Sequence, residues 1–134
     1  VDARRLQIRI LRDLPSELPL LRGDRVLLTQ ALLNLVRNGM DAMAHMPAER
    51  RILTIRGERG SATLRLSIAD RGGGIAPEIL PHLFEPFCTT KAEGMGMGLN
   101  ICRSVVEAHR GRLWHEARPD GGCIFNVELP LADT

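Results

Sequence analysis

The chain has 134 residues, of which 44% are hydrophobic and 25% charged, with a formal net charge of +2. This is the composition of a globular protein, and so small and dispersed a charge argues against binding to nucleic acid or a membrane surface. No apolar run approaches the ~20 residues needed to span a bilayer. The length predicts one domain, which we take as residues 1–134.

The first half of the chain predicts strands around one long helix. Polar and apolar residues alternate at 4–14, which is typical of a strand, and LPLL at 18–21 is a second, shorter one. Asp24 is a suitable N-cap for a helix that runs to about His45, just before Pro47.

The second half mixes further strands with shorter helices. In chain order we expect strands at 52–58 and 62–70, a short helix at 76–84, a loop at 85–97, a helix from about 98 to 109, and strands at 112–119 and 123–131. Strands alternating with a few helices predict an α/β fold, a two-layer sandwich in which helices cover one face of a mixed sheet.

The long helix is expected to have one polar face and one core face. The polar side chains fall within roughly 80° of arc: Gln30, Asn34, Asn38, Asp41 and His45. The opposite side forms an expected core stripe: Leu28, Leu32, Leu35, Gly39, Ala42 and Met46. Asparagine is a mediocre helix former, so two of them one turn apart favour a function over plain solvation. Amide oxygens can coordinate a hard cation, and amide NH₂ groups can donate to phosphate.

A carboxylate and three glycines follow the strand at 62–70. Asp70 ends that strand, and Gly72, Gly73 and Gly74 remove the side chains from the next stretch, which leaves room for a flat ring against backbone. An ionised carboxylate only accepts hydrogen bonds, so it suits an exocyclic amine such as that of adenine.

The stretch GMGMGLN at 94–100 places three glycines at alternate positions directly before a predicted helix. Glycines let backbone approach a ligand closely, and a helix N-terminus presents free N–H groups and the positive end of the helix dipole. This arrangement suits a phosphate chain.

Four segments in order, LNLVRNGMDAM, DRGGGI, LFEPFCTTK and GMGMGLN, resemble the N, G1, F and G2 boxes of the ATP-binding catalytic domain of bacterial sensor histidine kinases, in the GHKL superfamily. The resemblance implies the Bergerat fold, ATP and Mg²⁺ as cofactors, and Asn38 as the metal ligand. It further implies that Asp70 takes the adenine amine and that 85–97 is a lid over the nucleotide. The nucleotide-binding residues that it implies are Asn34, Asn38, Asp41, Asp70, Gly72, Gly74, Ile75, Lys91, Gly94, Gly96, Gly98 and Leu99.

The resemblance also implies a protein histidine kinase that acts in two-component signal transduction. The chain would donate the γ-phosphate of ATP to a histidine on a dimerisation and phosphotransfer domain of the same protein, with a response regulator as the further partner. None of the four histidines lies in a segment like the acceptor helix of such kinases, so we expect the acceptor outside this chain. The chain would be a cytoplasmic fragment of a longer kinase, membrane-anchored or not, without the acceptor-histidine and sensor domains. We expect no nucleic acid partner and no direct membrane contact.

Two alternatives stay open. Related GHKL ATPases place a glutamate one turn before the Mg²⁺-binding asparagine, and here that position is Asn34, which cannot act as a general base. A true ATPase would need another carboxylate, for which Glu93 is the obvious candidate. The other alternative is a non-catalytic module that senses nucleotide or docks a partner.

The three cysteines are odd in number and widely spaced, which indicates reduced thiols rather than disulfides: Cys88, Cys102 and Cys123.

Overall fold

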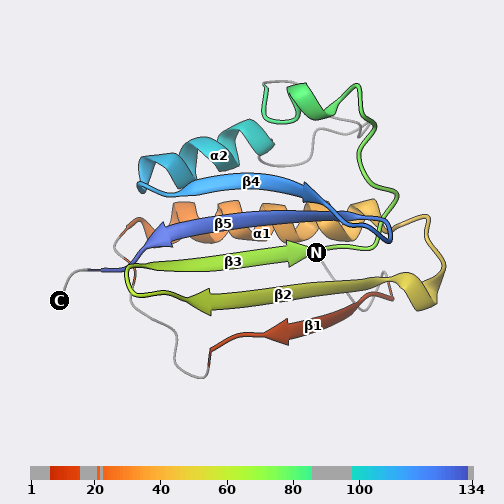
Figure 1. The fold of residues 1–134 in the computed structure, drawn as a ribbon, viewed down its shortest axis with the longest axis horizontal. Coiled ribbons are helices and arrows are strands. Elements are labelled where there is room, and N and C mark those ends of the chain that lie inside the picture. Colours follow the sequence, from red (N-terminus) through yellow and green to blue (C-terminus); the bar gives the residue numbers. More distant parts are fainter. Residues whose placement is uncertain (1–6, 16–20, 22, 86–97, 133–134) are drawn as a thin grey trace.

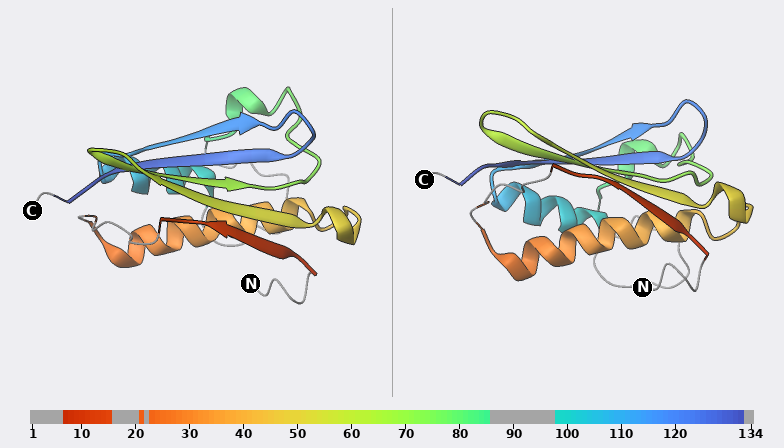
Figure 2. Two further views of the ribbon diagram at one scale, coloured as in Figure 1. Left: turned by 60° about the horizontal axis from the view of Figure 1, so that its bottom comes forward. Right: turned by 90° about the horizontal axis from the view of Figure 1, so that it is seen from below.

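The computed structural model describes residues 7–15, 21, 23–85 and 98–132. In these ranges five strands form one sheet, and both α-helices lie on the same face of it (Figure 1; Figure 2). The elements are β1 (Arg9–Asp13), α1 (Arg25–Ala42), the 3₁₀ turn η1 (Ala48–Arg50), β2 (Ile52–Arg59), β3 (Thr63–Ala69), the 3₁₀ turn η2 (Leu80–His82), α2 (Leu99–Ala108), β4 (Arg112–Ala117) and β5 (Cys123–Pro130).

The sheet is mixed, with the order β1-β2-β3-β5-β4. β1 pairs with β2 in parallel, and the other three pairs are antiparallel. The predicted α/β sandwich, with a mixed sheet covered on one face by helices, is therefore confirmed.

The core lies between the sheet and the two helices, as the alternation along β5 illustrates. Cys123, Phe125, Val127 and Leu129 are all at most 4% exposed and belong to the core, and Phe125 and Val127 are among its largest fully buried side chains. The residues between them point to the uncovered face of the sheet, because successive side chains of a strand alternate between its faces. Burial of such a stripe fixes the register of the strand.

Helix α1 begins as predicted and ends earlier than predicted. The Asp24 carboxylate accepts a hydrogen bond from the Leu27 N–H at 3.0 Å, which confirms the N-cap. The helix ends at Ala42, about three residues before His45.

The core stripe of α1 is partly as predicted. Leu35 and Gly39 are buried, whereas Ala42 is exposed, so that assignment was wrong. The buried face follows steps of four, through Ala31, Leu35, Gly39 and Met43, and therefore rotates away from Ala42 at the end of the helix.

Residues 76–84 do not form the predicted short helix. Only a 3₁₀ turn at Leu80–His82 interrupts a series of turns. Pro77 and Pro81 lack the N–H group that a continuing helix needs, which explains the difference. The short strand predicted at 18–21 falls mostly outside the described residues, although Leu21 forms an isolated bridge with Leu131.

His109 joins the two helices, a contact that the sequence did not predict. Its Nδ1 lies 2.7 Å from the Val105 carbonyl, and its Nε2 accepts the Asp24 N–H at 2.9 Å. With Nε2 as an acceptor, the matching tautomer has its N–H at Nδ1, which then donates to the Val105 carbonyl. Gly23 makes room for the ring, because a Cβ there would overlap the imidazole. In the described part of the chain, no helix combines the length and apolar composition needed to cross a membrane.

Candidate functional site

Asp70 is held in a fixed position at the end of β3. Its side chain is buried, and its Oδ1 accepts hydrogen bonds from the N–H groups of Gly72 at 2.8 Å and Cys123 at 3.3 Å. Its own N–H donates to the Cys123 carbonyl at 2.9 Å, which ties this corner to β5. Both hydrogen bonds that the described residues donate to the carboxylate use Oδ1. Oδ2 is therefore the oxygen that a ligand could use.

Burial raises the pKa of Asp70 above 3.8, and the hydrogen bonds from Gly72 and Cys123 and the charge of Arg118 offset this only in part. A buried carboxylate without a full set of partners costs free energy, so such a group is a candidate for function. Burial, together with this carboxylate, raises the pKa of the Cys123 thiol to about 11. Cys102 and Cys123 are both free, as predicted, and the structure shows both of them buried.

Helix α1 comes close to Asp70 at a glycine. A Cβ on Gly39 would lie 2.7 Å from Leu53 Cδ1, 3.5 Å from Asp70 Cβ and 3.8 Å from Asp70 Oδ2. Only glycine allows this approach without a shift of neighbours, and it brings the turn of α1 that carries Asn38 next to the end of β3.

The three glycines after Asp70 have different structural roles. A Cβ on Gly72 would lie 2.5 Å from the Ala42 carbonyl oxygen, so Gly72 serves close packing against α1 rather than an open space. A Cβ added to Gly73 or Gly74 would meet no heavy atom of the described residues within 4 Å, and Gly74 adopts φ +81°. The described residues therefore leave room at Gly73 and Gly74, shortly after the buried carboxylate along the chain, as a ligand with a flat ring would need. Ile75, the next residue, is half-buried and packs against the core.

Sequence reasoning missed two residues that contact the backbone carbonyl of Asp70 and so position it. Gly122 has φ +104°, and a Cβ there would overlap the Asp70 carbonyl oxygen. Arg118 Nη1 donates to the same oxygen at 3.3 Å. The Gly121–Gly122 pair was visible in the sequence, but a hairpin turn was sufficient to explain it.

The polar side chains of α1 differ in burial and in what they contact. The Asn34 amide donates to the Cys102 thiol of α2 at 3.4 Å, so this side chain also joins the two helices. Asn38 and Asp41 are half-buried, whereas Gln30 and His45 are exposed. Within the described residues no group of three or more His, Cys, Asp or Glu could hold a metal ion. The expected metal ligand, Asn38, is an amide, which suits Mg²⁺ bound partly through a nucleotide's phosphates.

Helix α2 begins directly after Gly98, which is its N-cap and makes no side-chain capping hydrogen bond. The first N–H groups of a helix lack partners within the helix, and they suit an anion. A Cβ on Gly98 would lie 2.7 Å from Asn100 Oδ1, and Leu99 packs half-buried against the core. Lys91, Gly94 and Gly96, as well as Glu93 and Cys88, lie outside the described residues.

Residues 23–133 match the family described as "Histidine kinase-, DNA gyrase B-, and HSP90-like ATPase". The chain belongs to this family. Among solved structures, this ATPase domain resembles the catalytic domain of histidine kinase ThkA with a TM-score of 0.82 and 32% identity, over 96% of this chain and 82% of that one. It also resembles ThkA in a complex with response regulator protein TrrA, with a TM-score of 0.79 and 30% identity, over 97% of this chain and 36% of that one.

Curated relatives are sensor proteins of greater length. The domain is 45% identical over 129 residues to the C4-dicarboxylate transport sensor protein DctS of Rhodobacter capsulatus, covering 96% of this chain and 20% of that protein. It is 39% identical over 132 residues to the sensor protein FixL of Bradyrhizobium diazoefficiens, covering 98% of this chain and 26% of that protein. The chain therefore spans about a fifth to a quarter of these relatives, and it is a catalytic domain of the histidine kinase type.

Proposed function

We propose that this catalytic domain, residues 1–134, binds Mg–ATP and provides the γ-phosphate for a histidine on a separate dimerisation domain of the same protein. The observation that carries the proposal is the geometry at Asp70. A buried carboxylate whose hydrogen bonds from the described residues all use Oδ1 precedes Gly73 and Gly74, where the described residues leave room for a ligand, in a chain of an ATPase family.

In this proposal, one group of residues binds the adenine base and another binds the phosphates. Asp70 Oδ2 accepts a hydrogen bond from the adenine amine. Gly74 and Ile75 border the base pocket, and Gly72 shapes it indirectly by letting α1 pack against this corner. The phosphates would be held by amides on the polar face of α1 and by the segment that leads into α2: Asn34, Asn38, Lys91, Gly94, Gly96, Gly98 and Leu99. Asp41, whose carboxylate only accepts hydrogen bonds, would contact a donor group of the nucleotide. Asn38 would hold the metal ion. Mg²⁺ would supply neutralisation of phosphate charge, and the remaining contribution of the domain would be positioning.

Asn34 favours phosphate donation over ATP hydrolysis. An amide cannot take a proton from water, and this one also donates to the Cys102 thiol. Without a general base at this position, bound ATP is retained until an external imidazole attacks the γ-phosphate. The proposed partners are then the histidine-bearing domain and a response regulator, in the cytoplasm. The ThkA–TrrA structure, a complex of that kinase with a response regulator protein, supports the second of these partners.

A calorimetric titration of the chain with ATP and Mg²⁺, followed long enough to detect continuous heat, tests the first half of this proposal. We expect saturable binding without sustained heat. Sustained heat would instead support the ATPase alternative, and the absence of binding would support a docking module.

Transfer of label from [γ-³²P]ATP to the purified dimerisation domain of the parent protein tests the second half. We expect labelling that requires both proteins and disappears when the acceptor histidine is replaced by alanine. Labelling that survives this replacement would contradict the proposed acceptor.

A further inference from the structure

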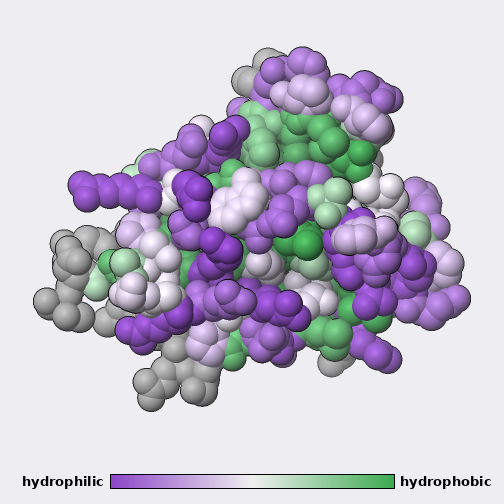
Figure 3. Space-filling view, in the orientation of Figure 1, coloured by the Kyte–Doolittle hydropathy of each residue, from purple (hydrophilic) through white to green (hydrophobic). Residues whose placement is uncertain are grey.

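The face of the sheet opposite the helices is uncovered and polar. Figure 2 shows both helices on one side of the sheet, and Figure 3 shows that hydrophilic side chains dominate the other side. A groove of about 520 Å³ runs across this face, over β1, β2, β3, β5 and β4. Its volume falls in the range of small-molecule sites, roughly 300–1,000 Å³.

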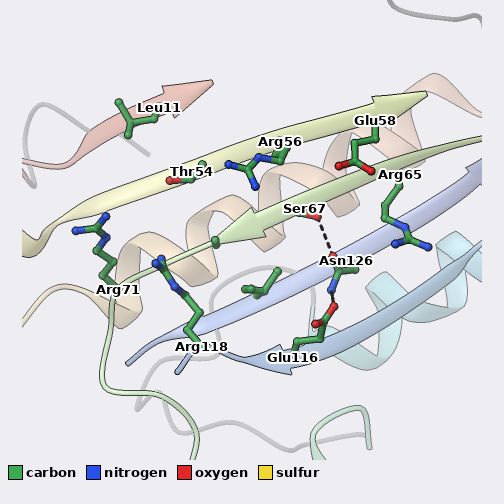
Figure 4. A pocket seen from close by; sticks show the side chains of 12 residues that line it. Leu11, Thr54, Arg56, Glu58, Arg65, Ser67, Arg71, Glu116, Arg118 and Asn126 are labelled. Carbon is green, nitrogen blue, oxygen red and sulfur yellow. Dashed lines mark hydrogen bonds between the residues drawn. The ribbon is translucent and has the colours of Figure 1, made fainter. Parts of the chain in front are cut away.

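The middle of the groove is a closed hydrogen-bond network. Ser67 Oγ donates to Asn126 Oδ1 at 2.8 Å, and Asn126 Nδ2 donates to Glu116 Oε1 at 2.7 Å (Figure 4). Asn126 is only 4% exposed, so this network is a fixed floor. Glu116 is committed to it by that hydrogen bond.

Most of the other charges along the groove are paired. Arg56 lies 3.2 Å from Asp13, and Arg65 lies 3.2 Å from Glu128. These two ion pairs offset the positive charge of the groove where it crosses β2 and β3.

The remaining end of the groove carries two arginines, Arg71 after β3 and Arg118 after β4, whose side chains Figure 4 shows at the same end. The Nε of Arg71 is buried and has no hydrogen-bond partner among the described residues. Arg118 donates to the Asp70 carbonyl through Nη1, and its Nε lies 3.5 Å from the exposed Asp120 carboxylate. A buried donor without an acceptor is costly, and an arginine fork matches the two oxygens of a carboxylate or phosphate.

We propose that this end of the groove binds a small oxyanion ligand, through a carboxylate or phosphate group seated between Arg71 and Arg118. The N–H at Arg71 Nε would donate to one ligand oxygen, and this buried donor would then have an acceptor. The site differs from the nucleotide site. Asp70 faces α1 and Arg71 lines the uncovered face, so the two consecutive side chains lie on opposite sides of the sheet.

Nuclear magnetic resonance titrations of the ¹⁵N-labelled chain, with inorganic phosphate in one arm and succinate in the other, test the site. We expect saturable shifts at Thr54, Ser67 and Arg71 in at least one arm, and the arm that saturates identifies the ligand group. Shifts confined to Gly98 and Leu99 would place the anion at the helix terminus and overturn the proposal. An absence of saturable shifts in both arms would also overturn it.

Matched variants separate a built site from general attraction to positive charge. We expect Arg71→Gln to weaken binding at least tenfold, because it removes both the charge and the buried Nε donor. Arg59→Gln, an exposed arginine that does not line the groove, should leave affinity unchanged. Equal losses in the two variants would refute a specific site. Arg71 rather than Arg118 is chosen because Arg118 also holds the Asp70 backbone.

Discussion

Replacement of Asp70 by asparagine separates the binding role of the carboxylate from its structural role. Asn has the same shape, and its Oδ1 can still accept the N–H groups of Gly72 and Cys123. Its NH₂ group would take the place of Oδ2, so that a donor would face the adenine amine. We therefore expect the fold to persist and ATP binding to be lost.

The size of the effect on binding follows from the two groups involved. A hydrogen bond to a charged acceptor contributes about 1.5–3 kcal/mol, and a buried donor left without a partner costs a further ~1–3 kcal/mol. A combined loss of about 2.5–6 kcal/mol corresponds to an increase in Kd on the order of 10²- to 10⁴-fold. Inosine triphosphate carries a carbonyl in place of the amine, so the variant should lose far less affinity for it than for ATP.

The stability of the variant should depend on pH in a definite direction. Burial raises the folded-state pKa of Asp70 above 3.8, so the folded chain holds this proton more tightly than the unfolded chain does. Ionisation of Asp70 therefore costs stability as the pH rises from 3.8 through the raised pKa, and this cost is absent below 3.8. Asparagine does not ionise, so the Asp70→Asn variant does not lose this stability as the pH rises. The free energy of unfolding of the variant minus that of the wild type should therefore be larger at pH 7 than at pH 3.

Calorimetry with ATP and inosine triphosphate, together with urea unfolding at the two pH values, measures both effects. Asp13→Asn is the matched control, because Asp13 has a side chain that is 72% exposed and lies on β1, which β2 separates from β3. An ATP affinity of Asp70→Asn equal to that of Asp13→Asn would refute the assignment of the adenine amine. If Asp70→Asn showed no cooperative unfolding transition at either pH value, the expectation that its fold persists would be wrong.

Three further predictions concern stability. Gly122→Ala should lower the free energy of unfolding by roughly 2–4 kcal/mol, because Gly122 has φ +104° and its Cβ would overlap the Asp70 backbone. The control is Gly73→Ala, whose Cβ meets no described atom within 4 Å, and its thermal unfolding midpoint should lie within about 1 °C of that of the wild type. Glu128→Gln should lower stability above pH 4.5 and progressively less at lower pH, because hydrogen bonds from two arginines depress the pKa of the Glu128 carboxyl below 4.5. Equal losses of stability in urea titrations at pH 7 and pH 3 would contradict this. His109→Phe should cost about 1 kcal/mol or more and speed hydrogen exchange at the Asp24 amide, and unchanged exchange there would disprove the bridge between the helices.

Local patterns predicted the elements well where one face of an element is buried. The alternation along 123–131 matches β5, and the polar and apolar faces at 25–45 match most of α1, because a side-chain period of two or 3.6 is set by backbone geometry alone. The helix predicted at 76–84 failed, since the apolar spacing there was outweighed by two prolines.

The candidate site was predictable as a set of residue types and only partly as a geometry. Asp70 and the glycines after it were identified from their order along the chain. That Gly72 packs against Ala42, or that Asn34 contacts Cys102, depends on how α1 meets β3 and α2. Such contacts join residues far apart in sequence, and no local pattern encodes them.

By itself, the sequence determined the family, the fold class and the carboxylate at the end of β3, because motif order and side-chain periodicity are local properties. The tertiary structure alone decided that Gly39 and Gly122 close in on Asp70 from two sides and that Arg71 faces the uncovered groove. The physical reason is packing. Close approach of two backbones depends on the relative placement of whole elements, which is fixed only when the core between the helices and the sheet is filled.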